Sequence, residues 1–140
     1  MKPFAAALAL ALLTTTTAAS AQSYPDDPGL GTERGIEQVN NSGQVGTVTL
    51  FRRGTATSVV VDLKGTDPSR AQSVRIYRGK SCEEFDPGPP VYFLHDMRNG
   101  SSVSSVKAAE EKLLSGNYNV VVFSSNARGA AATACGHLYS

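Results

Sequence analysis

The sequence predicts an all-β domain, an antiparallel sandwich or Greek-key barrel of about seven to eight strands. Apolar and polar residues alternate over short runs, and this period of two is that of half-buried strands. Turn residues separate the runs at regular spacing. A helical composition is confined to residues 108–115, with Gly116 placed to end the helix. One helical turn in a crossover loop leaves the all-β prediction unchanged.

The alternation begins near Ile36 and is clearest in the middle of the chain. In residues 73–77, Val74 and Ile76 alternate with Ser73, Arg75 and Tyr77, which gives the run one apolar face. The same reasoning applies along the rest of the domain. The predicted strands lie at residues 47–50, 58–63, 73–77, 91–97, 101–107, 118–124 and 132–139.

Two turns are predicted to join neighbouring strands as hairpins. Arg53-Gly54 lies between the first two runs. Asn99-Gly100 is a stronger signal, because both residues adopt the left-handed conformation that two-residue hairpin turns need. It predicts that residues 91–97 pair with residues 101–107.

The N-terminus has the composition of an export signal. A short basic start is followed by an apolar run too short to span a bilayer and then by Ala19-Ser20-Ala21, the pattern of a signal-peptidase site. We predict a signal peptide at 1–21, a flexible leader at 22–35 and one domain at 36–140. A membrane anchor is the alternative, but the apolar run is short and interrupted by threonines. No later segment approaches membrane-spanning length.

Charge and cysteine content narrow the class of protein. The net charge is +1, with no basic cluster and few aromatic residues, so nucleic-acid binding has no support. An exported chain meets an oxidising environment, in which the two cysteines, Cys82 and Cys135, are more often paired than free. A bond between them would tie the loop after residues 73–77 to the last strand.

Four short motifs together resemble copper/zinc superoxide dismutase and its short bacterial exported relatives, including domains grouped with the chordin-type repeats. The motifs are Gly79-x-x-Cys82, Gly88-Pro89-Pro90, Gly116-x-Tyr118 and the segment from Ala134 to Leu138. The resemblance covers roughly residues 36–140 and rests mainly on the order and spacing of the two cysteine motifs. It implies a Greek-key barrel of about eight strands. It also implies a disulfide that anchors the loop shaping the active site.

The family's metal ligands have no counterparts at the matching positions. The His-x-His pair that holds copper falls on Arg75 and Tyr77, and the histidine that bridges the metals falls on Pro90. The copper histidine of a later strand falls on Phe123, and the catalytic arginine falls on Ala132. None of these side chains replaces an imidazole in a redox copper site.

The histidine content supports the same conclusion. The chain has two histidines, His95 and His137, whereas the family's site takes several histidines and an aspartate. His95 and Asp96 are adjacent, so on a strand they would point to opposite faces and not converge on one ion. His137 is interpreted as a partly exposed strand residue. We therefore expect no metal, no cofactor and no catalytic residue of this type.

Other chemistry has little support in the sequence. No serine lies in a Gly-x-Ser-x-Gly elbow. Glu83, Glu84 and Asp86 form an acidic cluster that is able to bind calcium or a basic partner, but their spacing is not that of a known calcium loop. A solvated acidic loop is the simpler interpretation.

What remains is a surface patch of Arg75, Tyr77 and Phe123 at the vacated metal site. Such residues are frequent anchors in recognition. They also stack on one another through cation–π packing and would then only fill the former metal cavity. Both interpretations stay open from the sequence alone.

The sequence therefore predicts an exported, metal-free domain with a superoxide-dismutase-like fold. It would act as a binding or structural module in the periplasm or outside the cell, with a protein or surface partner. The alternative is a residual metal-binding or dismutase-type enzyme on the same fold. A protein-interaction domain of the chordin type is a further alternative.

Overall fold

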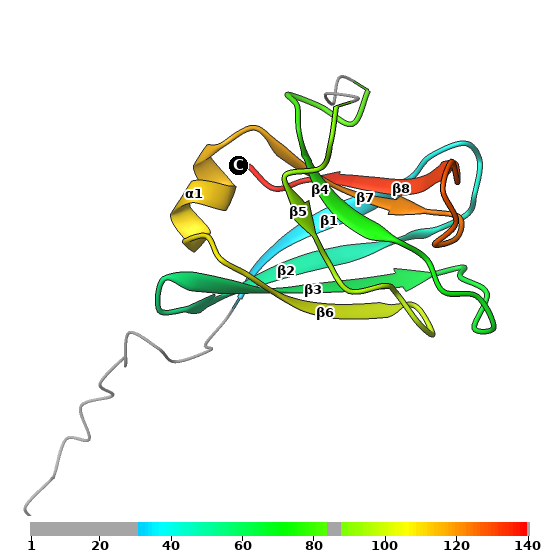
Figure 1. Ribbon diagram of the computed structural model, residues 1–140, viewed down its shortest axis with the longest axis horizontal. Coiled ribbons are helices and arrows are strands. Elements are labelled where there is room, and N and C mark those ends of the chain that lie inside the picture. Colours follow the sequence, from blue (N-terminus) through cyan, green and yellow to red (C-terminus); the bar gives the residue numbers. More distant parts are fainter. Residues whose placement is uncertain (1–30, 84–87, 140) are drawn as a thin grey trace, which may run out of the picture.

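The computed structural model describes residues 31–83 and 88–139. Within these residues the chain forms eight antiparallel strands and one short helix, which confirms the all-β prediction (Figure 1). The elements are β1 (Thr32–Gln38), β2 (Val45–Arg53), β3 (Ala56–Lys64), β4 (Val74–Arg78), β5 (Tyr92–Phe93), β6 (Ser101–Val106), α1 (Glu110–Ser115), β7 (Tyr118–Phe123) and β8 (Ala132–His137). No helix in these two stretches is long and apolar enough to cross a membrane.

The strands form one sheet that folds into two layers. Their order is β5-β4-β7-β8-β1-β2-β3-β6. Strand β1 joins the layers because it pairs with β2 from Thr32 to Ile36 and with β8 at Glu37 and Gln38. Figure 1 shows β4, β7 and β8 in one layer, β2, β3 and β6 in the other, and α1 at one end.

The barrel is nearly closed, and side chains bridge its seam. β5 and β6 are the two ends of the strand order. The Ser102 hydroxyl donates to the His95 carbonyl (2.6 Å), and the His95 backbone N–H donates to Ser104 Oγ (2.8 Å). Both serines are buried. Two hydroxyls thus supply contacts that a backbone ladder would supply in a closed barrel.

The predicted hairpin of residues 91–97 with residues 101–107 is wrong in its pairing. The turn itself forms: Asn99 (φ 53°) and Gly100 (φ 76°) are left-handed, and Arg98 bridges Ser101. Beyond it the strands separate, because β5 pairs with β4 and β6 pairs with β3. The segment between them crosses from one layer to the other.

The predicted β2–β3 turn and the predicted helix lie close to their observed positions. The β2–β3 hairpin turns at Gly54 (φ 61°) directly after Arg53. α1 begins two residues later than expected, at Glu110, and ends at Ser115. Gly116 does follow the helix, but its φ is −82°; a Cβ there would lie 2.3 Å from the Tyr118 ring, so close packing favours glycine.

The N-terminal boundary is earlier than expected. β1 begins at Thr32, ahead of Ile36, so the last residues of the predicted leader belong to the domain. The predicted signal peptide and residues 22–30 lie outside the described residues.

The core lies between the two layers and is made of the alternating apolar residues. Val48 and Leu50 of β2 and Val59 and Val61 of β3 have no exposed surface. Ile76 of β4 faces them from the other layer and is equally buried. Each side chain of this size contributes about 1.5–3 kcal/mol when fully buried.

A buried threonine fixes the crossover from β6 to α1. The Thr57 hydroxyl donates to the Ala108 carbonyl (2.7 Å), and Thr57 has no exposed surface. Replacing Thr57 with valine leaves that carbonyl without its donor and is expected to cost about 1–2 kcal/mol of unfolding free energy. Chemical denaturation measures this loss. Thr49→Val, on the opposite face of the neighbouring strand, is the control; an equal loss in both variants would contradict the assignment.

Candidate functional site

The candidate site lies on the outward face of the layer that contains β4, β7 and β8. Register places four residues in one row across this face: Phe93 of β5 is opposite Arg75, Arg75 is opposite Val121, and Val121 is opposite Cys135. Because side chains alternate along a strand, this row faces away from the barrel core. The row connects the sheet edge at β5 to the disulfide at β8.

Arg75 lies over two aromatic rings from neighbouring strands. Its guanidinium carbon is 5.4 Å from the ring centroid of Phe93 and 5.4 Å from that of Phe123. Tyr77 and Phe123 meet edge to face, with ring centroids 6.2 Å apart. The structure therefore brings the predicted residues Arg75, Tyr77 and Phe123 together and adds Phe93. We call these four residues the Arg75 patch.

Burial falls steeply across the patch. Tyr77 is 7% exposed, whereas Phe93, at the sheet edge, is 70% exposed. Tyr77 belongs to a second apolar cluster, with Val121 and Cys135, on the outward face and separate from the main core. Cys82, from the segment after β4, packs against this cluster together with Val39, Phe123 and Ala132.

Cys82 and Cys135 form a disulfide, which confirms the predicted pairing. Their Cα atoms are 5.9 Å apart and their sequence separation is 53. The bond fixes the segment after β4 to the middle of β8, beside Val121. The disulfide is therefore a structural part of the outward face.

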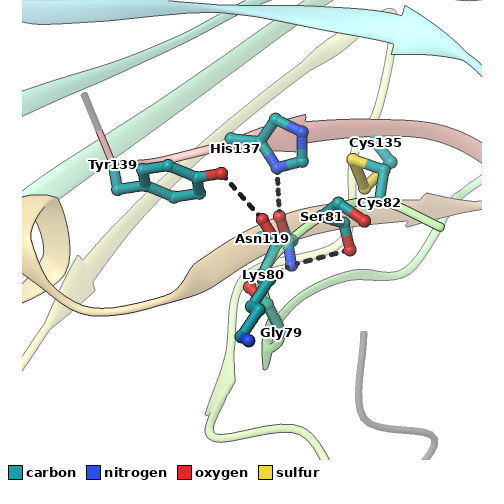
Figure 2. The surroundings of a disulfide bond; sticks show 8 residues. All are labelled: Gly79, Lys80, Ser81, Cys82, Asn119, Cys135, His137 and Tyr139. Atoms are coloured by element: carbon teal, nitrogen blue, oxygen red, sulfur yellow. Dashed lines mark hydrogen bonds between the residues drawn. A yellow bond between two sulfur atoms is a disulfide. The ribbon is translucent and has the colours of Figure 1, made fainter. Parts of the chain in front are cut away.

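A buried asparagine holds the same segment by hydrogen bonds (Figure 2). Asn119 of β7 has no exposed surface, and its Nδ2 donates to the carbonyls of Gly79 (2.9 Å) and Ser81 (3.3 Å). The Tyr139 hydroxyl adds a further bond, to the Lys80 carbonyl (2.8 Å). The three carbonyls are consecutive in the chain, so this stretch of backbone is fixed along its whole length.

This orientation of Asn119 also sets the tautomer of His137. Since the amide nitrogen faces two carbonyls, Asn119 Oδ1 is the atom that contacts His137 Nδ1, at 2.5 Å. An amide oxygen only accepts, so Nδ1 carries the proton and the lone pair of the neutral ring is on Nε2. His137 is partly exposed at the end of β8, as the sequence predicted.

A groove of about 400 Å³ lies beside the disulfide. Its lining residues are Gly35, Glu37, Gln38, Val39, Cys82, Glu83, Cys135, Gly136 and His137. In the described residues, no three His, Cys, Asp or Glu side chains lie together so as to hold a metal ion. Copper and zinc centres in proteins need such a group, with imidazole or thiolate ligands prominent among them.

The charge of the Arg75 patch is not balanced within the described residues. The ion pairs there join Arg52 to Glu110 and Glu111, at the α1 end of the barrel. The hydrogen bonds and ion pairs of residues 31–83 and 88–139 include none from the Arg75 side chain. Its contacts are the two aromatic rings, so its N–H donors remain available.

A shifted pKa is found away from this face. In the loop between β3 and β4, the pKa of the Asp67 carboxyl is lowered, chiefly because the Ser69 hydroxyl donates to it (2.7 Å) and also because the Ser69 backbone N–H does (2.9 Å). The turn is therefore stabilised above the ordinary carboxyl pKa and loses that stabilisation as the pH falls through the lowered value.

The remaining residues singled out in the sequence lie around the patch or away from it. Pro90 is partly buried just before β5, and Ala132 opens β8 opposite Phe123. His95 and Asp96 are both exposed, and Asp96 accepts from the Asn126 amide (3.1 Å). Glu83 is exposed, while Glu84 and Asp86 lie outside the described residues.

Two residues of this face were missed in the sequence. Phe93 lies in the apolar run 91–94, which gives no sign that one of its rings would meet Arg75. Asn119 carried a signal, since it is the polar residue in a strand whose other residues are aromatic or valine. A buried polar side chain in such a strand needs hydrogen-bond partners, and these come from a distant loop.

Comparison with known proteins gave no match: no family model fits the chain, and neither curated proteins nor solved structures show a significant similarity to it.

Proposed function

We propose that this chain is an exported, metal-free domain of superoxide-dismutase-like fold that serves as a binding or structural module in the periplasm or outside the cell. The observation that carries the proposal is the Arg75 patch. The three positions that the resemblance matches to copper ligands are Arg75, Tyr77 and Phe123, and on one outward face Arg75 and Tyr77 each contact the Phe123 ring. They carry a cation, a phenol and a phenyl ring instead of imidazoles.

The physical chemistry of this patch opposes a metal ion. A guanidinium is permanently charged and offers donors but no acceptor. At about 6 Å it repels a divalent cation by about 5 kcal/mol at an effective dielectric constant of about 20. The aromatic rings add no metal ligand of comparable strength.

Export is supported by two features of the chain. The N-terminal sequence has the order of a signal peptide, and Cys82 and Cys135 form a disulfide, which persists in oxidising compartments. A binding role is supported by the exposed ring of Phe93 beside an arginine that lacks a counter-charge in the described part of the chain. Aromatic residues and arginine are the side chains most enriched at binding hot spots.

Metal titration tests this proposal against the alternative of a residual metal-binding or dismutase-type enzyme. Calorimetry of the purified protein with copper and with zinc is expected to show no binding tighter than about micromolar. The double variant Arg75→His/Tyr77→His is expected to raise the copper affinity, because period-two histidines on β4 would face one ion. Arg53→His, on the β2–β3 hairpin, is the control. Stoichiometric copper in the natural protein would overturn the proposal.

A further inference from the structure

We propose that the Arg75 patch takes a carboxylate, supplied by a glutamate in an extended segment of a protein partner that lies along the edge strand β5. This inference rests on the proposed binding role and adds the chemistry of the partner. Three observations carry it: the guanidinium geometry, the exposed ring of Phe93 and the backbone of β5 at Phe93, which is not bonded across the seam.

The first observation is the state of the guanidinium. Arg75 lies over the rings of Phe93 and Phe123 at 5.4 Å from each, so cation–π attraction holds it in one place. Its N–H groups donate in the guanidinium plane as a fork, a geometry that matches the two oxygens of a carboxylate. A held arginine with unused donors loses less conformational freedom on binding than a mobile one.

The second observation is the apolar surface beside the charge. Phe93 is 70% exposed and is one of three large apolar side chains that the described part of the chain leaves exposed. A free anion would use the guanidinium but leave this ring in water. An acidic residue flanked by apolar side chains would cover both, so the patch favours a side-chain carboxylate over a small inorganic anion.

The third observation is the position of Phe93 on the sheet edge. β5 is the terminal strand of the order, and the side-chain contacts across the seam to β6 are made by His95, two residues beyond Phe93. In the described residues no hydrogen bond joins the Phe93 backbone to β6. The Leu94 N–H donates to the Val74 carbonyl (3.0 Å), so Phe93 and Arg75 form a pair without mutual backbone bonds. The backbone N–H and C=O of Phe93 therefore point away from β4, toward the position of an added strand.

Strand spacing then selects the acidic residue. Neighbouring strands lie about 4.8 Å apart, so a residue opposite Phe93 on an added strand begins about 10 Å from Arg75. Glutamate reaches further than aspartate by one methylene, and the Arg75 guanidinium lies 5.4 Å from the Phe93 ring at this edge. Residues two positions either side of the glutamate share its face and would contact the aromatic rings.

The test uses the full oxidised protein and blocked synthetic peptides. The probe is Val-Thr-Glu-Thr-Val, with Gln and Asp versions as matched controls, followed by nuclear magnetic resonance of the Arg75 side-chain Nε–H and the Phe93 backbone amide. The Glu peptide is expected to shift both signals and to bind about tenfold more tightly than the Gln peptide, with the Asp peptide between them. Added salt should weaken the Glu peptide most.

Variants locate the effect on the patch. Arg75→Gln is expected to reduce binding of the Glu peptide by about tenfold and to remove its preference over the Gln peptide. Phe93→Ser should weaken all three peptides, and Arg53→Gln, on the distant hairpin, should change none. Thermal unfolding of each variant shows that it is folded.

Four other results of these experiments would each overturn the inference. If the Glu and Gln peptides bind equally, the patch is an apolar surface and the proposed binding role survives without the carboxylate. If inorganic phosphate shifts the Arg75 signal as strongly as the Glu peptide, the site takes anions in general. If no peptide shifts either signal while copper and zinc still fail to bind, the side chains of the patch only pack against one another and bind no partner. Tighter peptide binding after Glu84→Gln and Asp86→Asn would make the chain's own acids the occupant.

Discussion

Replacing Cys82 and Cys135 together with alanine is expected to lower the free energy of unfolding by about 4 kcal/mol on the chain-entropy model, the largest single effect in this domain. The bond closes a loop with a sequence separation of 53. For a domain of this size, such a loss corresponds to a drop of roughly 15–20 °C in the unfolding midpoint. Calorimetric unfolding of the oxidised protein and the variant measures it.

Local packing adds to this entropic term. Cys135 is 4% exposed within the outward cluster that contains Tyr77 and Val121, and Cys82 packs against that cluster. Alanine at both positions removes the sulfur atoms from a buried site and leaves a small cavity. The variant is therefore expected to lose at least the entropic amount, unless the segment after β4 remains in place through its hydrogen bonds.

Reduction provides the matched experiment. The natural protein in dithiothreitol should unfold near the midpoint of the alanine variant, and the reductant should leave the variant itself unchanged. If the reduced and oxidised proteins unfold at the same temperature, the bond does not stabilise the fold.

The fold could be predicted where its cause is local. Alternation of valine and leucine at residues 47–50 and 58–63 predicted β2 and β3, and Val48, Leu50, Val59 and Val61 are buried as that pattern requires. The turn at Asn99-Gly100 was also predicted, because its left-handed backbone depends on those two residues alone.

Strand pairing at that turn could not be predicted, because a tertiary contact decides it. Leu94 and Met97 are 8% and 1% exposed, so the chain after β5 buries both while it crosses between the layers. Met97 also exchanges backbone bonds with Gln72 (2.7 and 3.1 Å). A pattern of apolar and polar residues says which face is buried but not which strand lies beside it.

The candidate site also contains residues that local spacing predicts and residues that only tertiary contacts bring together. Arg75 and Tyr77 share a face because they are two residues apart on β4, which the sequence contains. Phe93 joins them only because β5 pairs with β4, and Asn119 matters only because Gly79 and Ser81 lie over it. These contacts arise from pairing and loop placement, so local pattern could not reveal them.

Asn119→Ala is expected to lower the free energy of unfolding by about 2–3 kcal/mol, because it removes two donors from the Gly79 and Ser81 carbonyls and the acceptor of His137 Nδ1. Asn119→Asp keeps the shape but places a carboxylate against two carbonyls, so it should cost at least as much. Asn117→Ala, two residues away and exposed, should change stability by less than about 0.5 kcal/mol.

The same segment is held by the Cys82–Cys135 disulfide, so the two effects should not add. In the protein without the disulfide, Asn119→Ala is expected to cost less by about 1 kcal/mol, since the segment it anchors is already partly released. Denaturant unfolding of the wild type, each variant and the combined variant gives this coupling. Full additivity would mean that Asn119 and the disulfide stabilise the outward face independently. If the Asn119→Asp protein is as stable as the wild type, the Asn119 hydrogen bonds do not stabilise the fold.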